Sequence, residues 1–346
     1  MLSTMLRFLG GAAGRHPIYA HYGVTHRCNL RCRMCAIWRS AAPSKELSTA
    51  EVGELAQFLK DWGVISVSLG GGEPLLRPDI TDVVRAFTSR GLRTRLLTNG
   101  VTGTGELMEE VVNCGLREVS ISLDSLVPER QEWVYSRSDA LAEITQRLAI
   151  WRRLLKGGIL LLNCVVSRLN LDELPRIAWF ARKSGYFVSY VPVHIAGPGR
   201  ESGEVAADAP EFEIPPDRHG ELVATYRKLI GLKRRGFPIV NSTEFLIKSC
   251  EYLRTGRAEW RCEAGTLYVS VGPAGLVSPC HRVAEAGGVH FAELAARRDE
   301  FRRHARRWAR ECWGCMRPCW AEVSFLAKPR GMIEFAANLA RRPSGT

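Results

Sequence analysis

Short apolar runs alternate with longer amphipathic segments along the first 200 residues. Six of the runs have the length and the β-branched and aromatic content of strands, and each ends near a polar or glycine-rich turn. The predicted strands cover residues 19–26, 64–69, 92–98, 116–123, 158–166 and 187–194. Helical patterns separate successive strands, as in parallel β/α units. This order predicts an α/β fold, namely a partial (β/α)6 TIM-type barrel.

The sequence predicts where one helix begins. Residues 48–62 are predicted to be helical, with Ser48 as the N-cap and Glu51 completing a capping box. Residues 197–220 are rich in Gly, Pro and acidic residues, which predicts a long loop or linker. Two further helices are predicted at 221–235 and 244–253, and a cysteine-rich segment follows them. The alternation of predicted strands and helices therefore ends before the last third of the chain.

The overall composition is that of a globular protein. The chain has 346 residues, of which 46% are hydrophobic, enough to bury a large core. Its longest apolar run, from Gly157, is about half of the roughly 20 residues that a membrane span needs. The first 17 residues lack a convincing signal-peptide pattern. We therefore expect a cytoplasmic protein.

Positive charge is concentrated late in the chain. The formal net charge is +12, and seven arginines lie between residues 297 and 310, with Arg341 and Arg342 near the end. Such a cluster is typical of a solvated helix face, and it also suits a surface for nucleic acid, anionic lipid or an acidic substrate. The charge alone does not separate these interpretations.

Three cysteines form a compact ligand set directly after the first predicted strand. Cys28, Cys32 and Cys35 are spaced C-x3-C-x2-C. Three thiolates can hold three corners of a [4Fe-4S] cube and leave the fourth iron open to a substrate or cofactor. A structural zinc ion normally takes four ligands, and only His26 lies close by in the sequence. The spacing favours the cluster over zinc.

This loop resembles that of the radical S-adenosylmethionine (SAM) superfamily, although Met34 stands where an aromatic residue is usual. The segment Ser68–Pro78 resembles the family's second-strand motif, which implies that Gly71, Gly72 and Glu73 bind the methionyl part of SAM. The resemblance also gives candidates for lining the cofactor or substrate at the ends of later strands. They are Thr98, Asn99, Ser122, Asp124 and Asn163. Ordinary turn chemistry and barrel filling are the alternative for each of these five.

The resemblance implies the activity of the family. A reduced cluster would pass one electron to SAM, and the resulting 5′-deoxyadenosyl radical would abstract hydrogen from an unidentified substrate. The reaction would be a dehydrogenation, a crosslinking or a C–C or C–S bond formation. An electron donor such as flavodoxin or ferredoxin is expected.

The late cysteines resemble the C-terminal extensions called SPASM and twitch domains, whose hallmark is a cysteine, a β-hairpin, and a glycine separated by four residues from another cysteine. Here the glycine is Gly275. The resemblance implies a small C-terminal cysteine-rich domain with one auxiliary [4Fe-4S] cluster. Its ligands would be Cys262, Cys280, Cys312 and Cys315, with Cys319 or Cys250 as alternatives. A structural zinc site is the other interpretation.

These patterns divide the chain into five parts. Residues 1–17 are an N-terminal extension, 18–200 the partial barrel, 201–255 a linker with helices, 256–325 the auxiliary-cluster domain, and 326–346 a basic helix and tail. The segment from Phe325 onward is predicted to be a basic amphipathic helix that packs on the barrel or contacts an anionic membrane. A small-molecule, a peptide and a lipid-linked substrate all remain open.

Two rival functions are compatible with parts of this pattern. A non-catalytic iron-sulfur or zinc protein would bind nucleic acid through the basic residues, but the Gly72-Glu73 motif would then have no purpose, so nucleic acid is disfavoured. A radical methyltransferase would use one SAM as methyl donor and another as radical source. No segment resembles a separate cobalamin-binding domain, which argues against the version that needs one.

Overall fold

The computed structural model describes most of the chain. The described residues are 10, 16–39, 45–194, 209–281, 288–312, 314–326, 328, 331, 333–334 and 336–337. Residues 1–9, the first half of the glycine-rich and acidic linker, and most of the predicted basic C-terminal helix lie outside them.

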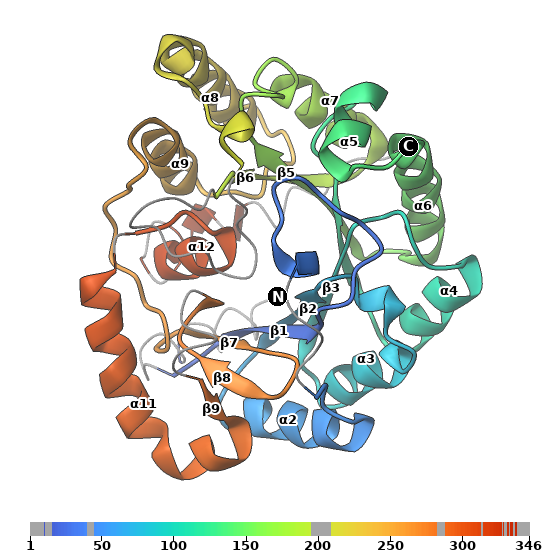
Figure 1. Cartoon of the computed structure of the whole chain (residues 1–346), viewed down its shortest axis with the longest axis vertical. Helices are drawn as coiled ribbons and strands as arrows, with labels where there is room; N and C mark the ends of the chain where they lie inside the picture. Colours follow the sequence, from blue (N-terminus) through green and yellow to red (C-terminus); the bar gives the residue numbers. More distant parts are fainter. Residues whose placement is uncertain are drawn as a thin grey trace.

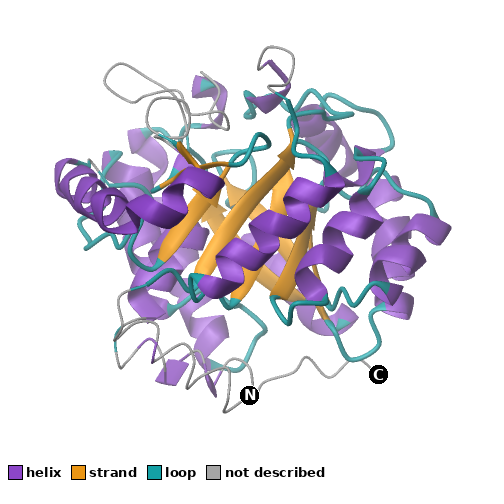
Figure 2. Ribbon diagram, turned by 90° about the horizontal axis from the view of Figure 1, so that it is seen from below, coloured by secondary structure: helices purple, strands orange, loops and turns teal. Residues whose placement is uncertain are grey.

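In the described part of the chain, nine strands form one curved sheet in the order β6-β5-β4-β3-β2-β1-β7-β8-β9. The six predicted strands are confirmed as β1 (Tyr19–Thr25), β2 (Ser66–Gly71), β3 (Arg93–Thr98), β4 (Glu118–Ser122), β5 (Ile159–Val166) and β6 (Phe187–Pro192). Each pairs in parallel with its neighbour along the chain. Figures 1 and 2 show the strands on the inside and the helices outside. The predicted partial (β/α)6 barrel is therefore confirmed.

Helices surround the strands, and the last of them lies on the inner side (Figure 1). In chain order they are α2 (Thr49–Asp61), α3 (Ile80–Thr88), α4 (Gly105–Asn113), α5 (Pro128–Tyr135), α6 (Ala140–Leu154), α7 (Leu174–Ser184), α8 (His219–Arg234), α9 (Thr243–Thr255), α11 (Phe291–Glu311) and α12 (Pro318–Leu326). Short 3-10 turns are η1 (Ile37–Arg39), η2 (Pro74–Leu76), η3 (Pro210–Phe212) and η4 (Pro216–Arg218). None of the helices among the described residues combines the length and the apolar character that a membrane span needs.

Helix α2 begins as its sequence predicts. The Ser48 hydroxyl accepts a hydrogen bond from the backbone N–H of Glu51, and the Glu51 carboxylate accepts one from the backbone N–H of Ser48 at 2.7 Å. This capping box satisfies two N–H groups that have no partner within the helix. Buried side chains such as Leu55 and Leu59 then pack toward the strands.

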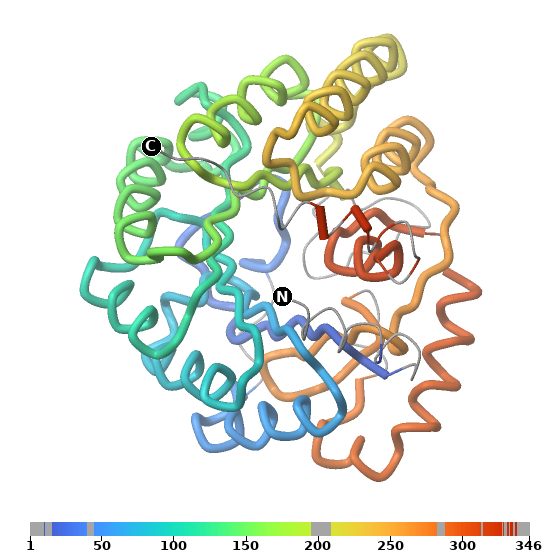
Figure 3. The backbone as a smooth tube through the Cα atoms, turned by 180° about the vertical axis from the view of Figure 1, so that it is seen from behind, coloured from blue at the N-terminus to red at the C-terminus, as the bar shows by residue number. Residues whose placement is uncertain are grey.

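The C-terminal strands extend the barrel sheet and do not form a separate one. β7 (Tyr268–Val271) pairs in parallel with β1, from Tyr19 to Tyr22, on the side opposite β2. β8 (Leu276–Ser278) returns as the predicted hairpin, and β9 (Val289–His290) pairs with β8. The hairpin turn contains Gly275 at φ +78°, a conformation that favours glycine. Figure 3 shows this late part of the chain beside the first strand.

Helix α12 lies between β6 and β7, on the side where the sheet is open between its edge strands β6 and β9 (Figure 1). It contacts α9, which in turn contacts β6. The main apolar core lies between the strands and the outer helices, with Leu69, Val119 and Leu162 fully buried there. The space enclosed by the strands is therefore walled by parts of the chain that are far apart in the sequence.

Candidate active site

A cavity of about 1490 Å³ occupies the inside of the partial barrel. Nearly all of the predicted N-terminal site residues line it, and they come from the loops after β1 to β4 and from β5. They are Cys28, Cys32, Cys35, Gly71, Gly72, Thr98, Asn99, Ser122, Asp124 and Asn163. The carboxyl ends of parallel strands meet at one edge of a sheet, which is why these separate segments come together.

The three cysteines lie on one loop at this edge, and each is partly exposed. Burial raises the pKa of all three thiols, and the charges of Cys35 and Cys28 raise that of Cys32 further, so the three sulfurs lie close to one another. The loop is held by backbone bonds, among them Arg33 N–H to the Val134 carbonyl at 3.0 Å. The indole N–H of Trp38 also donates to the Cys32 carbonyl at 3.2 Å.

Two glycines allow this loop to cross the end of β2. Gly71 has φ +111°, and a Cβ there would lie 2.3 Å from the Thr25 carbonyl oxygen. A Cβ on Gly72 would lie 2.1 Å from the Arg27 carbonyl oxygen. The Gly72 N–H donates to the Thr25 carbonyl at 2.7 Å. Glycines allow another backbone to approach closely. Here the backbone that approaches Gly71 and Gly72 is the chain's own cysteine loop.

Glu73 has a position different from the one its motif suggested. Its side chain is fully buried and is not among the residues that line the cavity. The carboxylate accepts hydrogen bonds from the Thr98 hydroxyl at 2.9 Å, and from the backbone N–H of Asn99 at 2.8 Å and of Leu75 at 3.1 Å. The Glu73 carboxylate thus holds the backbone at the end of β3. Its contact with the ammonium group of SAM stays a prediction.

Asp124 is a buried carboxyl at the end of β4. Its Oδ1 accepts the Val165 N–H at 2.7 Å, whereas its Oδ2 is buried with no hydrogen-bond partner among the described residues. Burial raises its pKa to about 7. Ser122 and Asn163 face the same cavity from β4 and β5. Asp124 therefore lines the cavity and keeps one buried carboxylate oxygen without a partner among the described residues.

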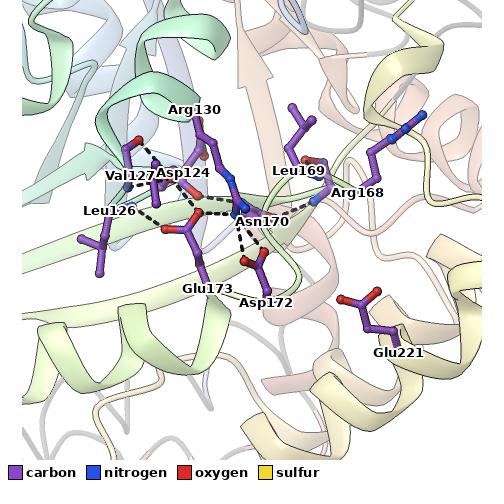
Figure 4. A network of polar contacts seen from close by, with 12 residues as sticks. Asp124, Leu126, Val127, Arg130, Arg168, Leu169, Asn170, Asp172, Glu173 and Glu221 are labelled. Carbon is purple, nitrogen blue, oxygen red and sulfur yellow. Dashed lines mark hydrogen bonds and ion pairs between the residues drawn. The ribbon is translucent and has the colours of Figure 1, made fainter.

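A polar network holds the turn after β4 (Figure 4). The Asn170 amide donates to the Asp124 carbonyl at 2.7 Å. Arg130 forms an ion pair with Glu173 at 2.7 Å, and the buried Glu173 carboxylate accepts the Leu126 N–H at 2.9 Å. This network fixes the backbone on both sides of Asp124, so its carboxyl is held in place.

The late cysteines gather beside the barrel. Burial raises the pKa of the Cys262 thiol, a hydrogen bond from Tyr268 partly offsets this, and the charges of Cys315 and Cys312 add to the rise. Cys280 is close enough for its charge to raise the pKa of Tyr268. Cys319 packs on the same apolar cluster, as does Tyr19 of β1. Cys262 thus lies near Cys315 and Cys312, and Cys280 lies near Tyr268, which contacts Cys262.

Cys250 and the two cysteines without a predicted role lie elsewhere. Cys250 is on α9. Cys164 is fully buried in β5, as expected of a core residue. Cys114 ends α4, and its sulfur accepts a hydrogen bond from Arg85 at 3.2 Å.

The cysteine chemistry fits iron-sulfur clusters at both places. Within the described residues, no three His, Cys, Asp or Glu side chains are gathered around one point as ligands of a single metal ion. Each thiolate of a [4Fe-4S] cube binds a different iron, so its ligands do not need to converge on one point. The first loop supplies three partly exposed thiols at a cavity large enough for a cofactor.

Sequence reasoning missed the polar groups deeper in the cavity. His21 of β1 and His281 lie edge to face with ring centroids 4.5 Å apart, and the Ser270 hydroxyl lies 2.8 Å from His281 Nδ1. Arg95 of β3 and Glu322 of α12 also line the cavity. The sequence did contain a signal for this polar wall, namely polar residues at every second position of β2 and β3. Alternate residues of a strand face the same side, so these side chains share one face of the sheet.

The barrel and its cysteine loop carry a Radical SAM domain. The model of the Radical SAM superfamily matches residues 22–181, from β1 to α7, which is a little under half of the chain. Among individual proteins, molybdenum cofactor biosynthesis protein 1 of Bos taurus is 34% identical over 198 residues, which cover 54% of this chain and 30% of that protein. The chain thus matches less than a third of the bovine protein's length.

Other relatives match over a greater length. GTP 3',8-cyclase of Marinobacter nauticus is 27% identical over 272 residues, which cover 78% of this chain and 76% of that enzyme. The crystal structure of Streptococcus suis SuiB bound to S-adenosylmethionine has a TM-score of 0.67 and 14% identity, over 91% of this chain and 75% of SuiB. At this identity the similarity to SuiB shows a shared fold.

Proposed function

We propose that this protein is a radical SAM enzyme that cleaves SAM reductively and abstracts hydrogen from a substrate held in the barrel. The observation that carries the proposal is the meeting of the Cys28, Cys32 and Cys35 thiols with the strand ends that line one cavity. When bound, the cluster would supply the electron that breaks the carbon–sulfur bond of SAM.

The chain's own residues would position the reactants. The backbone at Gly71 and Gly72 fixes the start of the cysteine loop, and Glu73 fixes the turn that carries Thr98 and Asn99. Asn99 also donates from its amide to Asn29 in the cysteine loop at 2.8 Å. A rigid loop of this kind holds a bound cofactor in one orientation relative to the substrate. Asp124 and Ser122 lie where they would contact the cofactor or the substrate.

We also propose one auxiliary [4Fe-4S] cluster on Cys262, Cys280, Cys312 and Cys315. The support is the proximity of Cys262 to Cys315 and Cys312, and of Cys280 to Tyr268, which contacts Cys262. The auxiliary cluster would transfer electrons or bind substrate, in a dehydrogenation or bond-forming reaction.

The expected partners and location belong to the same proposal. Reduction of the clusters needs an electron donor, for which a flavodoxin or ferredoxin is suited. We expect the enzyme to act in the cytoplasm. Peripheral contact with a membrane stays a hypothesis, because most of the predicted basic C-terminal helix lies outside the described residues.

The first experiment measures 5′-deoxyadenosine. Anaerobically reconstituted protein is given SAM and a strong reductant, and Cys32→Ala is compared with Cys114→Ala as a matched control. We expect product from the parent and the control, and loss of product by at least about a hundredfold in Cys32→Ala, because that variant lacks one cluster ligand. Equal product from Cys32→Ala, or no binding and no cleavage of SAM by iron-loaded parent protein, would contradict the proposal.

Metal content tests the auxiliary cluster. The parent is expected to bind about eight irons and Cys262→Ala about four, since each cube holds four. About four irons with one tightly bound zinc in the parent would show that the second site is a zinc site.

A further inference from the structure

The wall of the cavity has two chemically different sides. Most of the inward residues of β2, β3 and β4 are polar, among them Ser66, Ser68, Arg93, Arg95 and Ser120, whereas Leu97 of β3 is apolar. The facing side, formed by β5, β6 and α12, is mostly apolar, with Ile159, Leu161, Phe187, Val191 and Val323. A closed TIM barrel instead fills its interior with bulky branched side chains. The inside of this barrel is therefore open and amphipathic.

The polar side carries an excess of positive charge. Glu118 is the shared ion-pair partner of Arg93 and Arg95, and Arg95 reaches its Oε2 from Nε at 3.0 Å and from Nη2 at 2.7 Å. The Glu118 side chain is only 5% exposed, whereas each arginine side chain is 32% exposed and both line the cavity. Two guanidinium groups against one carboxylate leave a net charge of about +1 at this place.

An excess charge in a largely enclosed site favours a bound counter-ion, because a buried charge without compensation costs free energy. Guanidinium groups suit carboxylates and phosphates, which they bind through several N–H donors at once. The ion pair with Glu118 uses the Nε and Nη2 of Arg95, and a guanidinium has five N–H donors. The hydroxyl groups of Ser68 and Ser120 line the cavity beside the arginines.

Among the described residues, three other carboxyls line the cavity, those of Asp124, Glu322 and Glu334. Glu334 forms an ion pair with Lys233 at 3.3 Å. Asp124 lies beyond the opposite end of β4 from Glu118, near the cysteine loop. Glu322 of α12 accepts a hydrogen bond from the Ser242 N–H at 2.9 Å, and the positive charge of Lys233 lies close to it. The arginines thus define one positive end of the cavity.

We propose that the substrate is an amphipathic anion, whose carboxylate or phosphate binds at Arg93 and Arg95 and whose apolar body lies on the β5–β6 side. This inference rests on the proposed function and names the substrate class for the same cavity. Arg95 precedes Thr98 by three strand residues, about 10 Å at 3.3 Å per residue. The atom that reacts is therefore expected about 10 Å from the anionic group, toward the cysteine loop.

The size of the cavity agrees with this class of substrate. Typical small-molecule sites enclose roughly 300 to 1,000 Å³. A cavity of about 1490 Å³ has room for a cofactor at the cysteine loop and for a separate substrate that extends to the arginines.

The test measures binding and does not depend on turnover. Holoenzyme with SAM is titrated by calorimetry with dodecyl phosphate, dodecanoate and dodecanol below their micellar concentrations, and with inorganic phosphate. We expect one or both amphipathic anions to bind at least about tenfold more tightly than dodecanol and inorganic phosphate. The reason is that the site would bind both the charged group and the apolar chain. Preference for dodecyl phosphate would identify a phosphate head group, and preference for dodecanoate a carboxylate.

Two variants change the charge in opposite directions. Arg93→Gln leaves the Arg95–Glu118 pair neutral and is expected to weaken binding of the preferred anion by about tenfold or more. Glu118→Gln raises the net charge and is expected to tighten binding several-fold. Arg176→Gln, on the exposed outer side of α7, is the matched control with unchanged affinity. A folding defect would not produce opposite effects, and thermal unfolding of each variant checks this directly.

Several outcomes would overturn the inference. These are equal binding of dodecanol and both anions, binding of inorganic phosphate as tightly as dodecyl phosphate, or unchanged affinities in Arg93→Gln and Glu118→Gln. The result is independent of the radical chemistry. If no 5′-deoxyadenosine forms but the variants shift affinity as expected, the proposed reaction fails and the anion site stands. If 5′-deoxyadenosine forms but the affinities are unchanged, the proposed reaction stands and the anion site fails.

Discussion

Gly72 lies where the cysteine loop crosses the end of β2. Substitution of Gly72 tests whether the loop and the strand end must keep this close contact. An Ala side chain there would place Cβ 2.1 Å from the Arg27 carbonyl oxygen and 2.8 Å from that of His26. Backbone atoms cannot move away without shifting the loop that carries Cys28. We therefore expect Gly72→Ala to lose about half of the bound iron, as the first cluster is lost and the auxiliary one kept.

The matched control for this substitution is Gly105→Ala at the start of α4, where no atom lies within 4 Å of the added Cβ. It is expected to keep the parent's iron content and to unfold at the same temperature or slightly higher. Iron analysis and thermal unfolding measure both variants. Parent-level iron in Gly72→Ala would mean that the loop tolerates displacement.

At the residue scale, the Glu73 side chain also lies away from the cavity that its motif suggested. Glu73 directly follows the glycines that line the cavity, so its sequence position suggested contact with the cofactor. The backbone turns into η2 at this point, and the carboxylate caps that turn through the Leu75 N–H. The direction of a side chain at a turn depends on local backbone angles that the motif does not encode.

At the scale of elements, β7 matters because it covers the edge of β1. The hydrogen-bonding edge of β1 opposite β2 would otherwise be open to pairing with other chains. We expect a chain that ends at residue 255 to aggregate or to remain insoluble. A chain that ends at residue 326 keeps β7 to β9 and α12, and it is expected to remain soluble. Size-exclusion chromatography compares the two, and a monomeric, cooperatively unfolding 1–255 fragment would show that β1 needs no cover.

The elements were the most predictable part of the fold. The predicted helices at 221–235 and 244–253 correspond to α8 (His219–Arg234) and α9 (Thr243–Thr255). Their periodicity is local, so a short stretch of sequence contains it. The partner of β7 was not predictable, because a strand of four residues fits many edges and its pairing is decided by the barrel already formed.

At the scale of the whole molecule, buried carboxyls make stability depend on pH. Burial raises the pKa values of Glu73, Asp124 and Glu322 to about 7, against roughly 4 in an unfolded chain. Between these values the folded chain binds more protons than the unfolded one, so the free energy of unfolding falls as pH rises toward and through 7. We expect the unfolding temperature of the holoenzyme to decrease from pH 6 to pH 8.

Glu322→Gln isolates one of these groups. The amide keeps an oxygen to accept the Ser242 N–H but cannot ionise. The variant is expected to lose less stability between pH 6 and pH 8 than the parent, by on the order of 1 kcal/mol. Denaturant unfolding at both pH values measures the difference. Identical pH profiles would mean that Glu322 keeps an ordinary pKa in the folded chain.

The sequence by itself determined the features that neighbouring residues encode. Strand and helix positions, the Ser48 capping box and the spacing of Cys28, Cys32 and Cys35 all lie within short windows, where side-chain periodicity and loop length fix the outcome. Only the tertiary structure decided how distant segments meet. It joined β7 to β1, brought Cys319 and Tyr19 into one apolar cluster, and placed Arg93 and Arg95 against a single carboxylate. These outcomes depend on barrel curvature and register, which arise from the packing of the whole chain.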